Sequence, residues 1–592
     1  MNNTPRKKGI FLRLSKYVLK QWYFFIPAVI LTLVSNQLSL LGPKYSGIAI
    51  DAIKTSGDVD FPIVYENIIK MIGCYVLSAL FAYVLALLMI RLSQNISYGM
   101  RKQLFEKLNT LPVGYFDTHA TGDIISHLCY DVDTINSTLS HDLIQVMTSI
   151  YIVLGSAVYM WRISPVLFLV FALTVPVSVF FARYRSKKVR PLFRERSKKY
   201  GELNGYAEEM FTGARTIEAY GNEEVFSSRF NSHNKSAMDA YYKADYQAAM
   251  LFPTINFINN ISLTLVAVFG GLLYMYSENG VILETSLFFI TLGGVAQFVQ
   301  YSRKFAGPIN EFSNIIHEFQ SAFSAAERVF RVLDEEEETP DAQNACHLEK
   351  VHGQIDFGSV TFGYTADKVI LEDFTLNVKS GQTVAIVGPT GAGKTTIINL
   401  LMRFYDTNSG EILMDGKKIT DVVRRDWRGA FTMVLQDTWL FHGSVFDNIA
   451  YGREDVTPDE VYAAARAAKI DSYIETLPDG YDTILTDDGV NISKGQKQLI
   501  TIARAFLSKA PILILDEATS NVDSRTEMMI QEAMSELMKG KTSFVIAHRL
   551  STIKNADVIL VVKDGSIIER GTHEELLSKK GFYATLYNSQ FS

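Results

Sequence analysis

The segment Gly388–Thr395 has the residue types and spacing of a phosphate-binding loop. Its sequence, GPTGAGKT, fits the pattern G-x-x-x-x-G-K-[ST] in full. It follows an apolar run at 383–387 that is typical of a buried strand, and it opens an apolar helix at 396–402. Glycines allow backbone N–H groups to close around phosphate oxygens, and the helix N-terminus adds its dipole. We therefore expect Lys394 to hold the β- and γ-phosphates and the Thr395 hydroxyl to ligate Mg²⁺.

A second chemical element is the strand-like run PILILDE, which ends in the carboxylates Asp516 and Glu517. The first carboxylate is expected to hold Mg²⁺ through water. The second is placed to polarise an attacking water as general base. Many strands end in acidic residues, but together with the phosphate-binding loop the pair indicates nucleotide hydrolysis.

Further residues stand at strand ends in a characteristic order. Gln436 follows the run 431–435, His548 follows 544–547, and Tyr364 lies upstream of the phosphate-binding loop. The stretch NISKGQ, at 491–496, precedes the acidic strand by one helix. In this order the motifs closely resemble the ATP-binding cassette family, and the resemblance covers essentially the whole chain.

The resemblance implies a role for each matching residue. Tyr364 matches the aromatic residue that stacks on adenine, and Gln436 the residue that contacts Mg²⁺ and the attacking water. His548 matches the switch histidine, so the expected catalytic residues are Glu517, His548 and Gln436. The expected Mg²⁺ ligands are Thr395, Gln436 and, through water, Asp516. The expected ATP-binding residues are Tyr364, Gly388, Thr390, Gly391, Ala392, Gly393, Lys394, Thr395, Thr396 and Asp516.

The signature loop departs from the family pattern. Ser493, Lys494, Gly495 and Gln496 match the loop that contacts the ATP bound by the opposite subunit, but Lys494 replaces a glycine of the usual Leu-Ser-Gly-Gly-Gln. Glycine would cost least backbone strain in a loop that approaches phosphate. Because the hydrolytic residues on the same chain are intact, we expect a heterodimer with a second half-transporter whose own ATP site is degenerate. The alternative is a homodimer that tolerates Lys494.

The first half of the chain contains six long segments without Lys, Arg, Asp or Glu. Each is near or above the roughly 18 residues that span a bilayer. Six such segments predict a membrane domain and exclude a soluble motor or kinase. Residues 1–20 carry six basic residues and no acidic one, and nine basic residues lie between 183 and 199, so both termini and both long connections are predicted to be cytoplasmic. The segments lie between residues 20 and 44, 70 and 91, 142 and 162, 162 and 183, 245 and 278, and 284 and 303.

Composition over the whole chain conceals this division. The 592 residues carry a net charge of −6, are 48% hydrophobic and have a mean hydropathy of +0.10. These values exclude a disordered chain, a disulfide scaffold and a strongly basic nucleic-acid binder. Cys74, Cys129 and Cys346 match no metal or redox spacing and are expected to be isolated thiols.

The expected fold class is an all-α membrane domain followed by an α/β P-loop cassette. An interfacial helix is predicted at 1–20, a transmembrane domain at 21–333, a linker at 334–350 and a nucleotide-binding domain at 351–592. The long cytoplasmic connections should be helical, with tips at 118–123 and 212–219 that match the family's coupling helices. The predicted spans are about 21–48, 64–91, 138–162, 163–184, 246–277 and 281–304.

The resemblance implies an ATP hydrolase that exports molecules across the cytoplasmic membrane, most like the consensus-site half of bacterial heterodimeric multidrug exporters. Large amphipathic drugs or dyes are the expected substrates. Membrane lipid is an expected partner, and nucleic acid is not. A homodimeric lipid or peptide exporter or flippase remains the alternative. Polar residues of the spans either line a cavity or join helices by hydrogen bonds; they are Asn36, Gln37, Asn256, Asn259, Asn260, Gln297 and Gln300. No charged residue is expected at mid-span.

Overall fold

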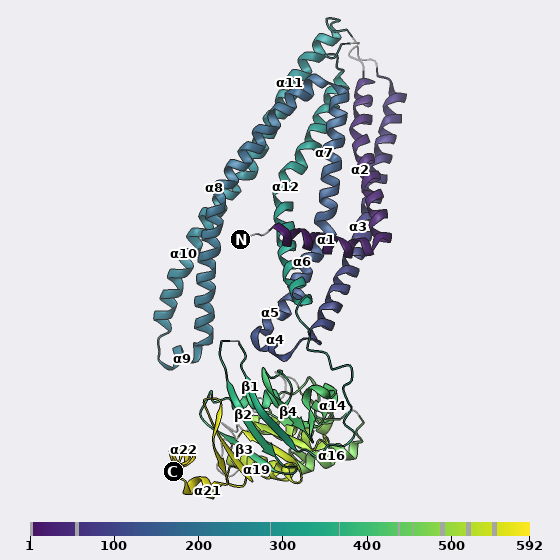
Figure 1. Ribbon diagram of the computed structural model, residues 1–592. Helices are drawn as coiled ribbons and strands as arrows, with labels where there is room; N and C mark the ends of the chain where they lie inside the picture. Colours follow the sequence, from purple (N-terminus) through teal and green to yellow (C-terminus); the bar gives the residue numbers. More distant parts are fainter. Residues whose placement is uncertain are drawn as a thin grey trace. The chain divides into compact units, whose positions relative to one another are not determined.

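The computed structural model describes residues 4–53, 59–283, 286–365, 367–435, 438–453, 455–485, 492–516, 523–546 and 553–591. These residues form two compact units. The helical unit comprises Met1–Asn109 and Thr121–Glu335, and the cassette unit comprises Thr110–Ala120 and Glu336–Ser592 (Figure 1). The predicted fold class, a helical membrane domain followed by an α/β cassette, is confirmed.

The helical unit begins with α1 (Thr4–Lys20), which ends just before α2 (Trp22–Asp51). A nearly continuous helix at 121–163 contains two short π-helical stretches. Four helical segments are long and apolar enough to cross a membrane within the described residues: Trp22–Asp51, Phe61–Leu108, Thr121–Ile163 and Asn256–Glu278. The other helices of this unit are α3 (Phe61–Leu108), α5 (Thr121–Ser126), α6 (Val132–Ser137), α7 (Leu143–Ile163), α8 (Pro165–Thr212), α9 (Ala214–Ala219), α10 (Glu223–Ala249), α11 (Leu251–Glu278) and α12 (Leu292–Leu333).

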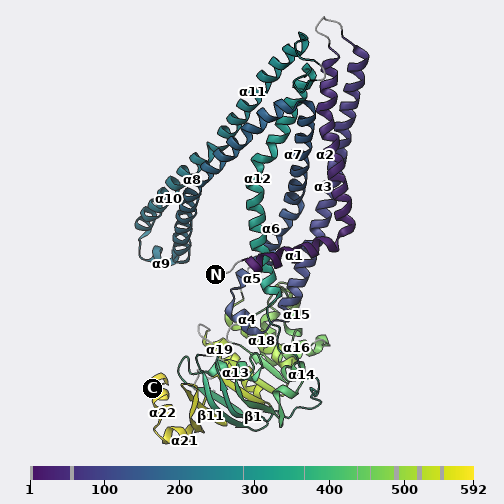
Figure 2. The same cartoon turned by 45° about the horizontal axis from the view of Figure 1, so that its top comes forward.

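Local residue chemistry determines several helix ends. Before α8, the Ser164 hydroxyl accepts a hydrogen bond from Leu167 N at 3.3 Å, and Pro165 occupies the first helical position, where its missing N–H costs nothing. At the far end, α8 stops at Gly213, and α9 turns the chain into α10. Figures 1 and 2 both show α8 and α10 side by side with α9 at their tip. The long connections are therefore helical, as expected.

The cassette unit contains a six-stranded sheet in the order β12-β11-β3-β10-β9-β6. β3 (Thr383–Val387) is parallel to both β10 (Thr542–Ile546) and β11 (Val558–Lys563), and only β12 (Ser566–Gly571) pairs antiparallel. The residues of β3 alternate between two cores: Val384 and Ile386 enter one, and Ala385 and Val387 the other. Burial of both faces explains the continuous apolar runs in these strands.

A second, antiparallel sheet and several helices complete the cassette unit. The sheet has the order β2-β1-β4-β5, and β7 (Gly443–Ser444) pairs separately with β8 (Ile484–Leu485). The remaining strands are β1 (Ile355–Phe362), β2 (Leu371–Val378), β4 (Ser409–Met414), β5 (Lys417–Lys418), β6 (Phe431–Val434) and β9 (Ile512–Asp516). The helices are α4 (Val113–Thr118), α13 (Lys394–Leu401), α14 (Arg424–Gly429), α15 (Val445–Ala450), α16 (Pro458–Ala467), α17 (Asp471–Ile474), α18 (Lys494–Leu507), α19 (Ser524–Met538), α21 (His573–Ser578) and α22 (Phe582–Phe591).

Candidate ATP site and its connections

The phosphate-binding loop joins the carboxyl end of β3 to the first turn of α13. Gly393 precedes α13 with a φ of 100°, a left-handed conformation that favours glycine. At Gly388 a side chain is excluded by contact, because a Cβ there would lie 2.1 Å from the Val562 carbonyl oxygen. The loop therefore presents its backbone at the N-terminus of a helix, which is the arrangement that binds phosphate.

Lys394 and Asp516 act on one another at this loop. The Lys394 ammonium donates to the carbonyl oxygens of Gly388 at 2.8 Å and Pro389 at 3.0 Å. Burial lowers the pKa of Lys394, and the negative charge of Asp516, at the end of β9, opposes that shift. Asp516 pairs in register with Ile546 of β10, so it stands at the carboxyl edge of the sheet.

The oxygen donors beside Lys394 suit Mg²⁺, which prefers carboxylate and hydroxyl ligands. Thr395 is exposed in the first turn of α13, and the charge of Asp516 acts on Lys394. When bound with ATP, Mg²⁺ would neutralise charge on the phosphates. The other residues predicted for catalysis, Gln436, Glu517 and His548, lie outside the described residues.

Tyr364 is hydrogen-bonded to the helix that follows the phosphate-binding loop. Its hydroxyl donates to Thr396 Oγ1 at 3.2 Å and accepts from Asn399 Nδ2 at 3.1 Å, and both partners are on α13. The side chain is 45% exposed, which leaves ring surface free for a flat ligand.

The signature residues form the start of α18. Ser493 is the N-cap: its hydroxyl accepts from Gln496 N at 3.3 Å, and Gln496 Oε1 accepts from Ser493 N at 2.9 Å. Lys494 is exposed at the first helical position, and Gly495 is buried. Lys494 has an ordinary helical backbone, so the backbone strain that we expected from replacing glycine is absent in this conformation. What remains distinctive is a long cationic side chain in place of a hydrogen atom.

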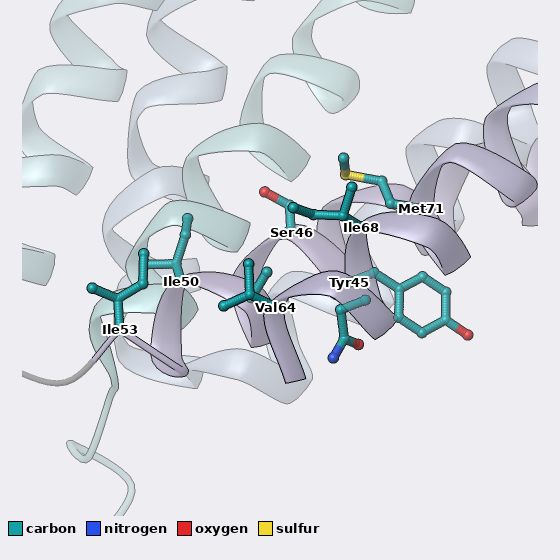
Figure 3. Close-up of a pocket in the computed structure, with 9 residues that line it drawn as sticks. Tyr45, Ser46, Ile50, Ile53, Val64, Ile68 and Met71 are labelled. Atoms are coloured by element: carbon teal, nitrogen blue, oxygen red, sulfur yellow. The ribbon is translucent and has the colours of Figure 1, made fainter. Parts of the chain in front are cut away.

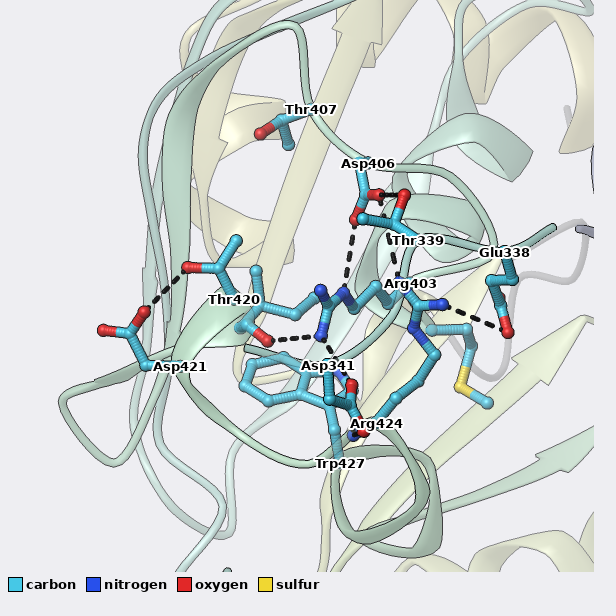
Figure 4. A network of polar contacts seen from close by, with 12 residues as sticks. Glu338, Thr339, Asp341, Arg403, Asp406, Thr407, Thr420, Asp421, Arg424 and Trp427 are labelled. Atoms are coloured by element: carbon cyan, nitrogen blue, oxygen red, sulfur yellow. Dashed lines mark hydrogen bonds and ion pairs between the residues drawn. The ribbon is translucent and has the colours of Figure 1, made fainter. Parts of the chain in front are cut away.

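The acidic linker is bound to the cassette rather than lying free beside it (Figure 4). Glu338 bridges two arginines, with 3.1 Å from Oε2 to Arg424 Nη1 and 2.5 Å from Oε1 to Arg428 Nη2. Asp341 accepts from Arg424 N at 3.1 Å. Arg403, only 4% exposed, donates to the Ile419 carbonyl at 2.9 Å and to Asp406 at 3.2 Å. The linker is thus held against α14.

One helical connection also belongs to the cassette unit. The unit includes Thr110–Ala120, whose helix α4 spans Val113–Thr118, so this contact lies N-terminal to the tip expected at 118–123. The Tyr405 hydroxyl donates to Asp117 Oδ2 at 2.5 Å, and Glu338 N donates to the Thr110 carbonyl at 2.9 Å. Sequence reasoning did not select Tyr405, Asp117 or the arginines, and the only available signal was the position of RFYD directly after α13.

The amides that were candidates for a substrate cavity mostly join helices. Gln37 of α2 accepts from Tyr151 and donates to Tyr159, both on α7, at 2.8 and 3.1 Å. Gln297 and Gln300 of α12 donate to the Lys44 carbonyl and to Ser46 Oγ, at 3.3 and 3.2 Å. Asn36 donates to the Thr32 carbonyl within α2 at 2.7 Å and to Thr148 Oγ1 of α7 at 3.3 Å. These contacts favour the interhelical interpretation for four of the seven residues.

A cavity of about 220 Å³ lies between α2 and α3 (Figure 3). Its lining is mainly aliphatic, and its amide, Asn67, already donates to the Ile63 carbonyl at 2.8 Å. Such a lining offers contacts to hydrocarbon and few to a polar ligand. The lining residues are Tyr45, Ser46, Ala49, Ile50, Ile53, Val64, Asn67, Ile68 and Met71.

Comparisons with known proteins agree with both halves of this architecture. Residues 25–298 match the ABC transporter transmembrane region, and residues 371–520 match the ABC transporter family. The chain is 40% identical to the uncharacterized ABC transporter ATP-binding protein YfiC of Bacillus subtilis, over 99% of this chain and 94% of that protein. It is 42% identical to the fatty acid ABC transporter ATP-binding/permease protein of Mycobacterium tuberculosis, over 89% of this chain and 81% of that protein.

Two further similarities extend over nearly the whole chain. The ATP-dependent lipid A-core flippase of Hahella chejuensis is 34% identical, over 98% of this chain and 97% of that protein. The solved structure of a bacterial Atm1-family ABC exporter with ATP bound superposes with a TM-score of 0.75 at 28% identity, covering 96% of this chain and 98% of that chain. The chain belongs to the ABC transporter family, as an exporter half-transporter whose membrane domain is fused to an ATP-hydrolysing cassette.

Proposed function

We propose that this chain is the catalytic half of a heterodimeric exporter that moves amphipathic small molecules, of the multidrug type, across the cytoplasmic membrane. Lys494 carries the proposal: it is exposed in the first turn of α18, on a chain whose own phosphate-binding loop is complete in sequence. In the dimer, one ATP would be held by this chain's Lys394 and hydrolysed with Glu517 and Gln436. The other would face Lys494. The site that faces Lys494 would be built on the partner's phosphate-binding loop and would be the degenerate one.

In the proposed cycle, ATP binds more tightly to the closed pair of cassettes than to the open pair. ATP held between two cassettes favours their closure, and hydrolysis removes the contacts that favour it. Six spans, with both chain termini in the cytoplasm, would turn that closure into outward opening. His548 would sense the γ-phosphate, and Ser493, Gly495 and Gln496 would contact the ATP on the opposite cassette.

The chain expressed alone tests the heterodimer. The purified protein in lipid nanodiscs is expected to hydrolyse ATP slowly and without stimulation by amphipathic dyes. A fast, dye-stimulated and transport-competent homodimer would refute the heterodimer and leave the exporter itself intact.

A lipid exporter or flippase is the second candidate, and Lys304 of α12 favours a lipid with an anionic headgroup. Asp51, at the end of α2, accepts from Gly293 N at 2.7 Å and from Thr291 Oγ1 at 2.9 Å, so the outer ends of α2 and α12 are tied together. Lys304 lies 12 residues along α12 and Ser39 lies 12 residues back along α2, each about 18 Å from the tied ends. This is near the middle of a bilayer core about 30 Å thick.

Lys304 is half-buried, and its ammonium donates to Ser39 Oγ at 2.8 Å. No carboxylate lies within ion-pair distance of it in the described part of the chain. The absence of a charge at mid-span, expected from the sequence, therefore does not hold if α12 crosses the membrane from Leu292. An intramembrane cation without an anionic partner is costly and is usually kept for a ligand or a pathway. The relatives named for fatty acid and lipid A are consistent with an anionic amphiphile.

Binding of a fluorescent long-chain fatty acid and of the matching fatty alcohol distinguishes these candidates. If Lys304 meets an anionic headgroup, Lys304→Gln weakens fatty-acid binding by about tenfold, the scale of one lost charge-assisted hydrogen bond, and leaves the alcohol unchanged. Lys102→Gln, on the cytoplasmic part of α3, is the control and should change neither. Equal weakening of acid and alcohol would assign Lys304 a structural role.

A further inference from the structure

Tyr405 lies between the proposed adenine platform and α4. Its ring meets the ring of Tyr364 at a centroid distance of 4.9 Å and an interplanar angle of 86°, an edge-to-face contact. Its hydroxyl donates to Asp117 Oδ2 of α4 at 2.5 Å. One side chain therefore contacts the residue that faces the base and the helix that joins the cassette unit from the membrane connection.

The contacts around Tyr405 leave it little freedom to move independently. A third ring, that of Phe362 in β1, lies 5.8 Å away at 61°. Gly114 of α4 approaches so closely that a Cβ on it would lie 2.8 Å from Tyr405 Cε1. Tyr405 therefore contacts both Tyr364 and α4, and side chains packed in this way have few alternative positions.

The hydroxyl of Tyr405 is a donor throughout the physiological range. Burial raises its pKa, and the hydrogen bond to the Asp117 carboxylate raises it further. The bond to an ionised acceptor is of the charge-assisted kind, which is stronger than a bond between neutral groups.

We propose that Tyr405 is a positioning residue that links occupancy of the adenine platform at Tyr364 to the position of α4. This rests on the role proposed for Tyr364. A bound base fixes the position of the Tyr364 ring, and Tyr405 packs against that ring. The Tyr405 hydroxyl in turn fixes the position of Asp117 on α4 through their hydrogen bond. Because coupling between two sites is reciprocal, a change in α4 alters base binding by the same factor.

Hydrogen–deuterium exchange of the full-length chain in nanodiscs tests this link. Exchange of the amides at 113–118 is compared without ligand, with AMP-PNP and with tripolyphosphate, which has the phosphates but no base. We expect AMP-PNP to slow exchange about fivefold more than tripolyphosphate does. Tyr405→Phe and Asp117→Ala should remove most of that difference. Asp117→Asn should retain it, because the amide oxygen still accepts from the hydroxyl.

Tyr462→Phe of α16 is the matched control. Among the described residues the Tyr462 hydroxyl has no hydrogen-bond partner, and its ring contacts Tyr481. If Tyr405→Phe responds to AMP-PNP as the wild type does, or if tripolyphosphate protects 113–118 as well as AMP-PNP does, the link is refuted. If AMP-PNP fails to protect the phosphate-binding loop at 388–396, the ATP site itself is wrong and the link falls with it.

Discussion

The carboxylate of Asp131 is a buried point of attachment between two distant helical segments, and Asp131→Asn should weaken the helical unit measurably. The Asp131 side chain is 2% exposed. It accepts from Arg328 Nε at 3.0 Å and Nη2 at 2.6 Å, a bidentate pair, and its Oδ2 is 2.8 Å from His127 Nδ1. Burial alone would raise the pKa of Asp131, but the hydrogen bonds from Arg328 and His127 outweigh it and lower the pKa below its usual range.

The loss of unfolding free energy depends on which hydrogen bonds of the Asp131 carboxylate an asparagine side chain can still make. An amide has one oxygen acceptor and would turn its NH₂ group toward a donor, so at least one charge-assisted bond, worth about 1.5–3 kcal/mol, is lost. The guanidinium of Arg328 is 43% exposed and can be rehydrated. The loss should therefore stay below the roughly 3–5 kcal/mol of a fully buried broken pair. We expect about 2–3 kcal/mol, or a midpoint lowered by roughly 4–6 °C.

Thermal unfolding in detergent, followed by fluorescence of a thiol-reactive dye, measures this shift as a difference between variants. Arg328→Met should be more harmful than Asp131→Asn, since it leaves the buried carboxylate with His127 alone and removes both hydrogen bonds from the guanidinium. The double variant should be milder than the sum of the two single variants. Glu106→Gln is the control, because the Lys102–Glu106 pair is 3.8 Å long and more than half exposed on both sides. An Asp131→Asn midpoint equal to that of wild type, or strictly additive single variants, would refute this account.

Three other predictions concern the same residues and the ATP site. Because the pKa of Asp131 is lowered on folding, its contribution is present above the unfolded value of about 3.9 and is lost as pH falls through the folded value. The difference in midpoint between wild type and Asp131→Asn should therefore be present at pH 5 and shrink below about pH 4. In the assembled transporter, Glu517→Gln should nearly abolish ATP turnover, whereas Lys494→Gly should change it less. Ser493→Ala and Thr457→Ala each remove one capping box, on α18 and α16, at a cost of about 1 kcal/mol of stability. Only Ser493→Ala should lower ATPase activity by more than the loss of folded protein explains. Equal effects of the two substitutions on activity would show that Ser493 acts only as a helix cap.

Local sequence patterns were sufficient for the phosphate-binding loop, because the strand, the glycines and the helix that form it are contiguous. They were also sufficient for the fold class, since the absence of charge over bilayer-length segments and the alternation of apolar runs each have one main physical reading. Continuous burial along β3, whose successive side chains enter two different cores, confirms the second of these patterns.

Contacts between distant parts of the chain could not be derived in this way. Asp131 and Arg328 are separated by 197 positions, and Asp117 and Tyr405 by 288. Each looks like an ordinary polar residue in its local context, because nothing local specifies its partner. The roles of Gln37 and Gln300 were undecided for the same reason, since an amide that lines a cavity and one that joins two helices occupy identical sequence surroundings.

The start of α12 at Leu292 is a second feature that charge counting missed. Thr291 caps this helix by accepting from Gly294 N at 3.0 Å, so the helix begins later than the charge-free segment does. With this later start, Lys304 lies 12 residues along α12 instead of at the far end of the predicted span 281–304. A cap formed by threonine before Leu-Gly-Gly is a weak signal in sequence, because glycines disfavour the helix that follows.

The ATPase rate of this chain purified alone, compared with that of its Lys494→Gly variant in the same nanodiscs, distinguishes a heterodimer from a homodimer. We expect a slow rate, unaffected by amphipathic substrates, because both sites of any self-assembled dimer would face Lys494. A fast, Glu517-dependent rate that rises with substrate and is unchanged by Lys494→Gly would contradict it and establish a homodimer.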